Sequence, residues 1–124
     1  MRTTALVIIT CAALGVGHPA GAQDLSDYSV AELLEPCLTG DNDSREGQVA
    51  ERECNQYLRG FTDAFLSYTD NGKAENVCLP ERDGRTDKLR RAFMLWAYRN
   101  YGDRGQPAAS GLLATLKTHF VCKQ

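Results

Sequence analysis

Four cysteines carry the clearest chemistry in this sequence. Cys37, Cys54, Cys78 and Cys122 are separated by long intervals, without the close Cys-x-x-Cys pairs that most zinc sites use. Four thiolates could in principle still bind one Zn²⁺. In an exported domain of this size, four cysteines more economically form two disulfides, because small domains depend on such cross-links for stability. The choice between these two chemistries depends on whether the chain is exported.

The first 22 residues predict export. Arg2 gives a positively charged start, residues 5–16 form an apolar run, and Ala20-Gly21-Ala22 offers a cleavage site. The apolar run is short for a membrane span, and Gly, His and Pro follow it closely. Together these features predict a secretory signal peptide that is cleaved after Ala22.

Removal of the signal peptide leaves residues 23–124 as a single domain, which we expect in the periplasm without stable membrane insertion. Cys11 leaves with the signal peptide, so five cysteines become four. A lipid anchor on Cys11 is the alternative, but Thr10 stands where a small residue is usual. The whole chain has a net charge of −2, and weak acidity in an exported domain argues against nucleic acid as a partner.

Enzyme signatures are scarce in the mature domain. His119 is its only histidine, because His18 lies in the signal peptide, and paired cysteines leave no thiol nucleophile. Residues 41–47 (DNDSREG) resemble a calcium loop, but Arg45 and Glu46 replace the oxygen ligand and the glycine that such a loop requires. We therefore predict no catalytic residues, no metal site and no cofactor.

Two helices are expected in the first half of the domain. Ser29 and Glu32 form a capping box that opens a short helix, which Pro36 should end. Residues 43–46 predict a second capping box and the start of a long helix, which a turn at residues 70–72 should end. One face of this long helix should be buried, because apolar residues recur at three- and four-residue steps: Ala50, Cys54, Tyr57, Leu58, Phe61, Phe65 and Tyr68. Gly60 inside this helix predicts the close approach of a neighbouring helix.

Two further helices are expected in the second half. Thr86 reads as the N-cap of a third helix with Leu89, Phe93 and Trp96 toward the core, and Gly102 should close it. Pro107 fits the first turn of a fourth helix, where its missing N–H is harmless. That helix should present Ala109, Leu112, Leu113, Leu116 and Phe120 to the core. Because no stretch alternates like a strand, we predict an all-α fold: a compact bundle of four antiparallel helices without a sheet.

This antiparallel arrangement selects one of the three disulfide pairings. Cys37 ends the first helix and Cys54 lies early in the second, so they should meet at one end of the bundle. Cys78 and Cys122 lie at the opposite end. A disulfide tolerates a Cα–Cα separation of only about 4.4–6.8 Å, which excludes pairing across the length of the long helix. The sequence therefore predicts the disulfides Cys37–Cys54 and Cys78–Cys122.

Two exposed loops are candidates for binding a partner protein. Residues 81–86 contain Arg82 and Arg85, and arginine favours bidentate contacts to acidic groups. The competing interpretation is a solvated face with local ion pairs, since acidic residues alternate with the basic ones. The loop 101–107 is glycine-rich and carries Tyr101 and Arg104. Binding residues tend to lie on exposed loops of a rigid scaffold.

Three motifs make the chain resemble a known family. They are the helix motif Cys-x-x-Tyr-Leu-x-Gly from Cys54 to Gly60, the turn Cys78-Leu79-Pro80, and the terminal Phe-x-Cys that ends at Cys122. On these marks the chain resembles the Rap/Tai family of periplasmic immunity proteins, from about Leu33 onward. It departs from the family where Val121 stands in place of a frequent proline.

The resemblance implies a helical, disulfide-linked domain, in many cases a homodimer. Members protect bacteria from peptidoglycan amidases that the type VI secretion system delivers, and they block the amidase active site with a loop. The leading hypothesis is therefore an exported immunity protein rather than an enzyme. The alternatives are a small periplasmic stress chaperone, which would expose apolar faces in acid, and a structural subunit of an envelope complex.

Overall fold

The computed structural model describes residues 28–70, 72–74 and 76–123, so the predicted signal peptide lies outside the described residues. The helices are α1 (Val30–Thr39), α2 (Arg45–Tyr68), α3 (Arg85–Arg99) and α4 (Ala108–His119), with a 3₁₀ helix η1 (Tyr101–Asp103) between the last two. Two short strands, β1 (Lys73–Ala74) and β2 (Val77–Cys78), form a hairpin. The helical prediction is confirmed, and the expected absence of a sheet is wrong.

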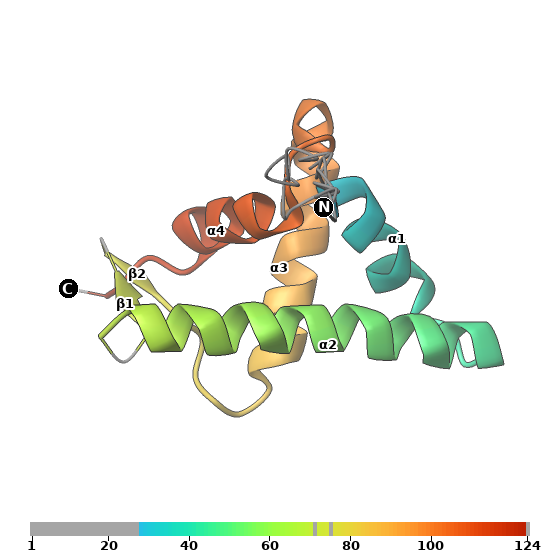
Figure 1. Ribbon diagram of the computed structural model, residues 1–124, viewed down its shortest axis with the longest axis horizontal. Coiled ribbons are helices and arrows are strands. Elements are labelled where there is room, and N and C mark those ends of the chain that lie inside the picture. The colour runs from blue at the N-terminus through green and yellow to red at the C-terminus, as the bar shows by residue number, and fades with distance from the viewer. Residues whose placement is uncertain (1–27, 71, 75, 124) are drawn as a thin grey trace, which may run out of the picture.

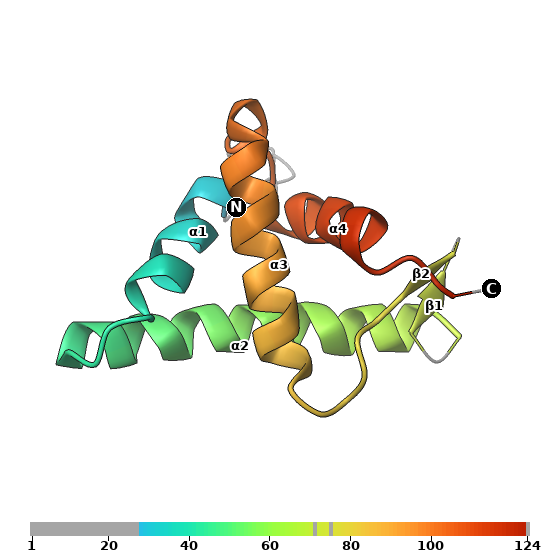
Figure 2. The ribbon, with the colours of Figure 1, turned by 180° about the vertical axis from the view of Figure 1, so that it is seen from behind.

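The helices do not align as an antiparallel bundle. Figure 1 shows α2 as a long base that α3 crosses, with α1 and α4 on the two sides of α3. The view from behind in Figure 2 shows the same crossing. Apart from Gly47 in the first turn, the buried residues of α2 lie in its middle: Cys54, Leu58 and Thr62. The helices α1 and α3 pack on α2. The buried face of α2 is short although the helix has 24 residues, because the other helices cross it and do not run along its whole length.

One core joins the four helices. Its fully buried large side chains are Val30, Leu33, Leu58, Leu89, Phe93, Leu112 and Leu116. Gly111 allows α1, α3 and α4 to converge, because a Cβ there would lie 2.5 Å from Val30 Cγ2 and 3.1 Å from Trp96. Most predicted core residues are confirmed, but Tyr68 is 91 % exposed, Leu113 is 37 % exposed, and Ala108, not Ala109, is buried. Gly60 is exposed with no atom within 4 Å of a Cβ, so the predicted helix approach is wrong.

Helix ends depart from the predictions by small shifts. The capping box of Ser29 is present as predicted, but α1 continues through Pro36 to Thr39. The N-cap of α2 is Ser44, whose hydroxyl accepts a hydrogen bond from the Gly47 N–H at 2.9 Å. The third helix begins at Arg85 after Gly84, which has a φ of 63°, and not after a Thr86 cap. A left-handed backbone at this position favours glycine.

Two disulfides tie the ends of the elements together in the predicted pairing. Cys37 bonds to Cys54 and joins α1 to α2, with Cα atoms 5.0 Å apart. Cys78 bonds to Cys122, also with Cα atoms 5.0 Å apart. Beside the second disulfide, the Cys78 N–H donates to the Phe120 carbonyl at 2.8 Å and the Cys122 N–H to the Asn76 carbonyl at 2.6 Å. The C-terminal segment is thus fastened to the hairpin.

Candidate partner-binding surface

The connection between α3 and α4 is a compact, internally bonded loop. The backbone N–H and the side-chain amide of Asn100 both donate to the Trp96 carbonyl, at 2.9 and 2.8 Å, and end α3. The N–H of Asp103 then donates to the Asn100 carbonyl, and that of Gln106 to the Asp103 carbonyl, each at 3.0 Å. These turns hold residues 100–107 as a defined projection, which is the upper end of α3 in Figure 1.

The same loop is bonded to the start of α1. The Val30 N–H donates to the Gln106 carbonyl at 2.8 Å, and the Ala31 N–H donates to the Arg104 carbonyl at 2.9 Å. The first amides of a helix have no partner within the helix, and here the loop carbonyls supply one. In the opposite direction, the Ala108 N–H donates a hydrogen bond to the Tyr28 carbonyl at 2.9 Å. The loop is therefore fixed on the scaffold before any partner arrives.

Tyr101 and Arg104 are brought together on this loop. The guanidinium carbon of Arg104 lies 4.5 Å from the centroid of the Tyr101 ring, within the range of a cation–π contact. The Arg104 Nε also donates to the Ala97 carbonyl at 3.2 Å. Arg104 thus supports the loop from within, while Tyr101 is 74 % exposed. Arg104 therefore has a structural role in the loop, which the sequence does not predict.

Tyr98 extends the surface, and the sequence prediction missed it. It is 78 % exposed and lies one helical turn before Tyr101, and Leu95 lies a further turn back with a partly exposed side chain. Leu95 and Tyr98 are three residues apart and share one outer face of α3, and Tyr101 follows in η1 after the cap residue Asn100. That spacing, read against the buried set Leu89, Phe93 and Trp96, was the signal available in the sequence.

Arg82 and Arg85 lie at the other end of α3. The helix has 15 residues, so the two loops are about 22 Å apart along its axis. The Arg85 Nε donates to the Pro80 carbonyl at 2.8 Å, which holds the segment after the hairpin, whereas Arg82 is exposed. The structure therefore separates the two candidate loops into two distinct surfaces.

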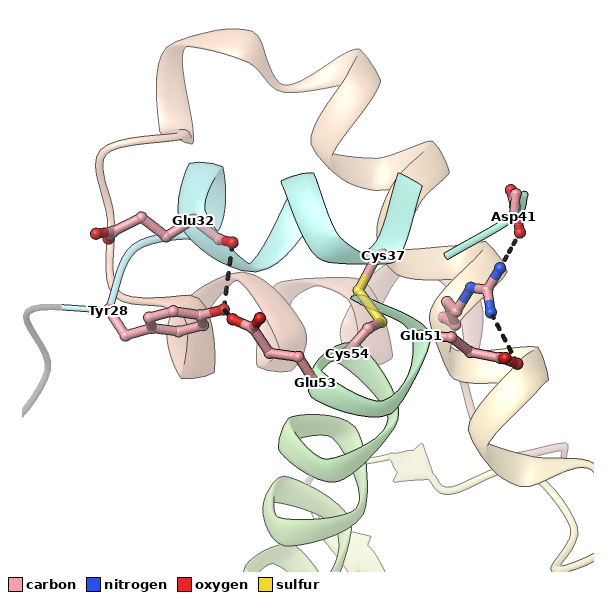
Figure 3. The surroundings of a disulfide bond; sticks show 8 residues. Tyr28, Glu32, Cys37, Asp41, Glu51, Glu53 and Cys54 are labelled. Atoms are coloured by element: carbon pink, nitrogen blue, oxygen red, sulfur yellow. Dashed lines mark hydrogen bonds and ion pairs between the residues drawn. A yellow bond between two sulfur atoms is a disulfide. The ribbon is translucent and has the colours of Figure 1, made fainter. Parts of the chain in front are cut away.

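The basic segment of α3 is in part an ion-paired face. Arg90 bonds to Asp41 and lies 3.9 Å from Glu51, and its own side chain is nearly buried. Figure 3 labels the two carboxylates, Asp41 and Glu51, and marks their ion pairs with dashed lines. The pairing fastens the α1–α2 connection to α3, which favours the ion-pair interpretation for this arginine.

A second polar group surrounds the start of α1. The Tyr28 hydroxyl lies 2.8 Å from Glu53 Oε1 on α2 and 3.2 Å from the Glu32 carbonyl oxygen on α1 (Figure 3). Burial, followed by the hydrogen bond to Glu53, raises the pKa of Tyr28 well above its usual value. The hydroxyl therefore remains a donor at every physiological pH and links α1 to α2.

The described residues offer little for catalysis or metal binding. Among them, no three His, Cys, Asp or Glu side chains gather as metal ligands would. His119 is half-buried at the end of α4, and all four described cysteines are bonded in pairs. None of the helices in the described part of the chain is long and apolar enough to cross a membrane.

Comparison with known proteins finds one match. A family model described as Rap1a immunity proteins matches residues 29–122, which is most of the chain and all four helices. The match begins at the Ser29 cap and ends at Cys122, so it includes both disulfides. No match was found among curated proteins or among solved structures.

Proposed function

The chain belongs to the Rap1a family of immunity proteins, and we propose that it neutralises a peptidoglycan amidase by covering that enzyme's active site. The family implies a non-catalytic protein that binds a partner effector. The finer proposal is that the effector is an amidase delivered by a type VI secretion system. We further propose that the protein meets it in the periplasm, after cleavage of the signal peptide in residues 1–22.

The observation that carries the steric mechanism is the loop 100–107. It projects from the end of α3, and three backbone hydrogen bonds between Tyr28–Ala31 and Arg104–Ala108 fix it to the scaffold. Such a loop loses little conformational entropy when it enters a groove, so more of its contact energy appears as affinity. A rigid projection is the shape that an active-site cleft accommodates.

The side chains on this loop and on the last turn of α3 suit a protein interface. Tyr98 and Tyr101 are large, exposed and three residues apart, and Arg104 lies against the Tyr101 ring. Tyrosine and arginine are among the residues most enriched in the positions that dominate binding energy. By contrast, Arg85 at the other end of α3 is occupied with the Pro80 carbonyl. We therefore assign the main contact to the loop 100–107 and at most a secondary role to Arg82.

The test uses the oxidised mature protein and the amidase that it retains in affinity capture. Tyr101→Ala and Tyr98→Ala should each weaken inhibition of peptidoglycan hydrolysis and raise Kd by about 10- to 30-fold, the effect of a residue worth about 1.4–2 kcal/mol. Tyr68→Ala is the matched control, because Tyr68 is more exposed still but lies at the far end of α2. Light scattering on the complex would also give the number of copies of each chain and so test the homodimer that the family resemblance implies.

Two results would overturn the proposal. If an amidase is captured but both tyrosine variants inhibit it as well as the unmodified protein does, the loop is not the inhibitory element. If the captured partner has no hydrolase activity on peptidoglycan, the family membership stands and the amidase assignment fails.

A further inference from the structure

A groove separates the second half of α1 from the first turns of α2. It has a volume of about 470 Å³. Pro36, Val49 and Ala50 give it an apolar lining, and Val49 is 52 % exposed although it is a large aliphatic residue. On α2 the lining residues recur at helical intervals from Glu46 to Glu53, so one face of the helix is left uncovered there. The loop 100–107 contacts the opposite end of α1, so this is a separate surface.

The rim of the groove is acidic. Glu35 comes from α1, and Glu46 and Glu53 come from α2, whereas Arg45 is the one cation among the lining residues. Glu35, Glu46 and Arg45 form no ion pair within the described part of the chain. Glu53 is held in place by the Tyr28 hydroxyl, as Figure 3 shows. The groove thus combines an apolar floor with a net charge of −2, from three carboxylates and one guanidinium, that nothing described in the chain neutralises.

We propose that this groove binds a lysine or arginine side chain carried on an apolar segment of a protein partner. The aliphatic stem of such a side chain would cover Val49 and Pro36, while its charged end would reach the glutamates. Ion pairs to carboxylates in a partly enclosed site are stronger than those on an open surface. The proposal does not depend on which enzyme the loop inhibits, because it concerns a different face of the molecule.

A second copy of the chain is a poorer occupant than another protein. The exposed basic segment of this chain, residues 82–91, alternates with Glu81, Asp83 and Asp87. These carboxylates would approach the acidic rim together with the arginines. Repulsion between these like charges would disfavour the binding of a second copy. The expected occupant is therefore a segment that is basic and has no neighbouring acidic residues.

The test is a titration of the oxidised mature protein with the peptide acetyl-Ala-Leu-Lys-Ala-Leu-Lys-amide, followed by backbone amide shifts in NMR. The expected result is saturable shifts centred on Val49 and Ala50, which weaken as salt is added. The double variant Glu35→Gln/Glu46→Gln should raise the Kd of the peptide by roughly three- to tenfold, as expected for the loss of two partly exposed ion pairs. The matched control Glu81→Gln/Asp83→Asn removes the same charge elsewhere and should leave the Kd unchanged.

Each other outcome overturns the proposal. Absent shifts at millimolar peptide, or shifts spread over all acidic surfaces, would show that the groove is not a site. Equal binding of a peptide with norleucine in place of lysine would show that the carboxylates do not select the ligand. Concentration-dependent self-association that is lost in Glu35→Gln/Glu46→Gln would show that the occupant is a second copy.

Discussion

The Tyr28 hydroxyl lies 3.2 Å from the Glu32 carbonyl oxygen, which is the carbonyl that Pro36 leaves without a helical donor. In an α-helix this oxygen would accept from the N–H of residue 36, and proline has none. The one hydroxyl proton, which is shared with Glu53 Oε1 at 2.8 Å, gives this oxygen a longer, partial hydrogen bond in place of the missing amide. The relationship explains how α1 runs through Pro36 to Thr39 instead of ending there, as the sequence predicts.

Tyr28→Phe should therefore destabilise the protein. It removes the hydroxyl from both the Glu32 carbonyl and Glu53, and we expect the free energy of unfolding in urea to fall by about 1–2 kcal/mol. The loss should be smaller in a Pro36→Ala background, because the backbone amide of the new alanine would then bond to the Glu32 carbonyl. Tyr68→Phe, which changes an exposed hydroxyl, is the control. Equal losses in the two backgrounds would refute the proline explanation.

The two helical glycines Gly60 and Gly111 should respond in opposite directions to alanine. Gly60→Ala places a methyl group in open space within α2 and should stabilise the protein by about 0.5–1 kcal/mol through helix propensity. Gly111→Ala drives a methyl group to 2.5 Å from Val30 Cγ2 and should destabilise it by about 1–3 kcal/mol through overpacking. Urea unfolding of both variants checks the pair. A destabilising Gly60→Ala would indicate a constraint on that face that the contacts do not explain.

The disulfides show which features the sequence could predict. Their pairing depends only on which element ends come together, and it holds although the helices cross instead of running antiparallel. The Ser29 cap is likewise local, since its bonds join residues three apart. The course of α1 past Pro36 depends on Tyr28, and the hairpin depends on the C-terminal segment that pairs beside it. Contacts of this kind cannot be predicted from the periodicity of apolar residues in a helix or strand.

The loop 101–107 stays a prediction as a binding site, and the structure shows how its residues lie. Tyr101 is exposed on this loop, as the sequence predicts, whereas the backbone hydrogen bonds that fix the loop to α1 were not predicted. Arg104 turns inward to the Ala97 carbonyl, which no composition rule indicates. Tyr98 belongs to a helix, so the composition of the loops does not indicate it.

The two disulfides should differ in their resistance to reduction. Cys37 and Cys54 are fully buried, whereas Cys78 and Cys122 are partly exposed beside the hairpin. A mild thiol should therefore reduce Cys78–Cys122 first, because attack requires access to a sulfur atom. Differential alkylation and mass spectrometry of the native protein would show the order. Earlier reduction of Cys37–Cys54 would contradict the burial of that pair.

Substitution of Arg104 should lower the stability of the protein more than substitution of Arg82, because Arg104 makes structural contacts and Arg82 lies on the surface. Arg104→Ala removes the hydrogen bond to the Ala97 carbonyl and the contact with the Tyr101 ring. We expect the free energy of unfolding to fall by about 1–2 kcal/mol. Arg82→Ala changes an exposed side chain and should alter it by less than about 0.5 kcal/mol. Thermal unfolding at one pH compares the two directly, and similar effects would mean that Arg104 does not support the loop.

The Ser29–Glu32 capping box should make part of the stability depend on acid pH. The side-chain hydrogen bond from Ser29, and then its backbone N–H, hold the pKa of Glu32 below the ordinary value of 4.5. A depressed pKa means that the contribution is present above pH 4.5 and is lost as pH falls through the folded-state pKa. Glu32→Gln should therefore be less stable than the unmodified protein at pH 6, and the difference in the free energy of unfolding should shrink below pH 4.

The control for the capping box is Glu35→Gln, on the same helix but without a bond to Ser29, which should show no such convergence. Because Val30 and Ala31 hold the loop 100–107, the acid-dependent loss should also appear as faster amide exchange at those two residues. A difference between Glu32→Gln and the unmodified protein that stays constant from pH 6 to pH 3 would show that the capping box is not the acid-sensitive element.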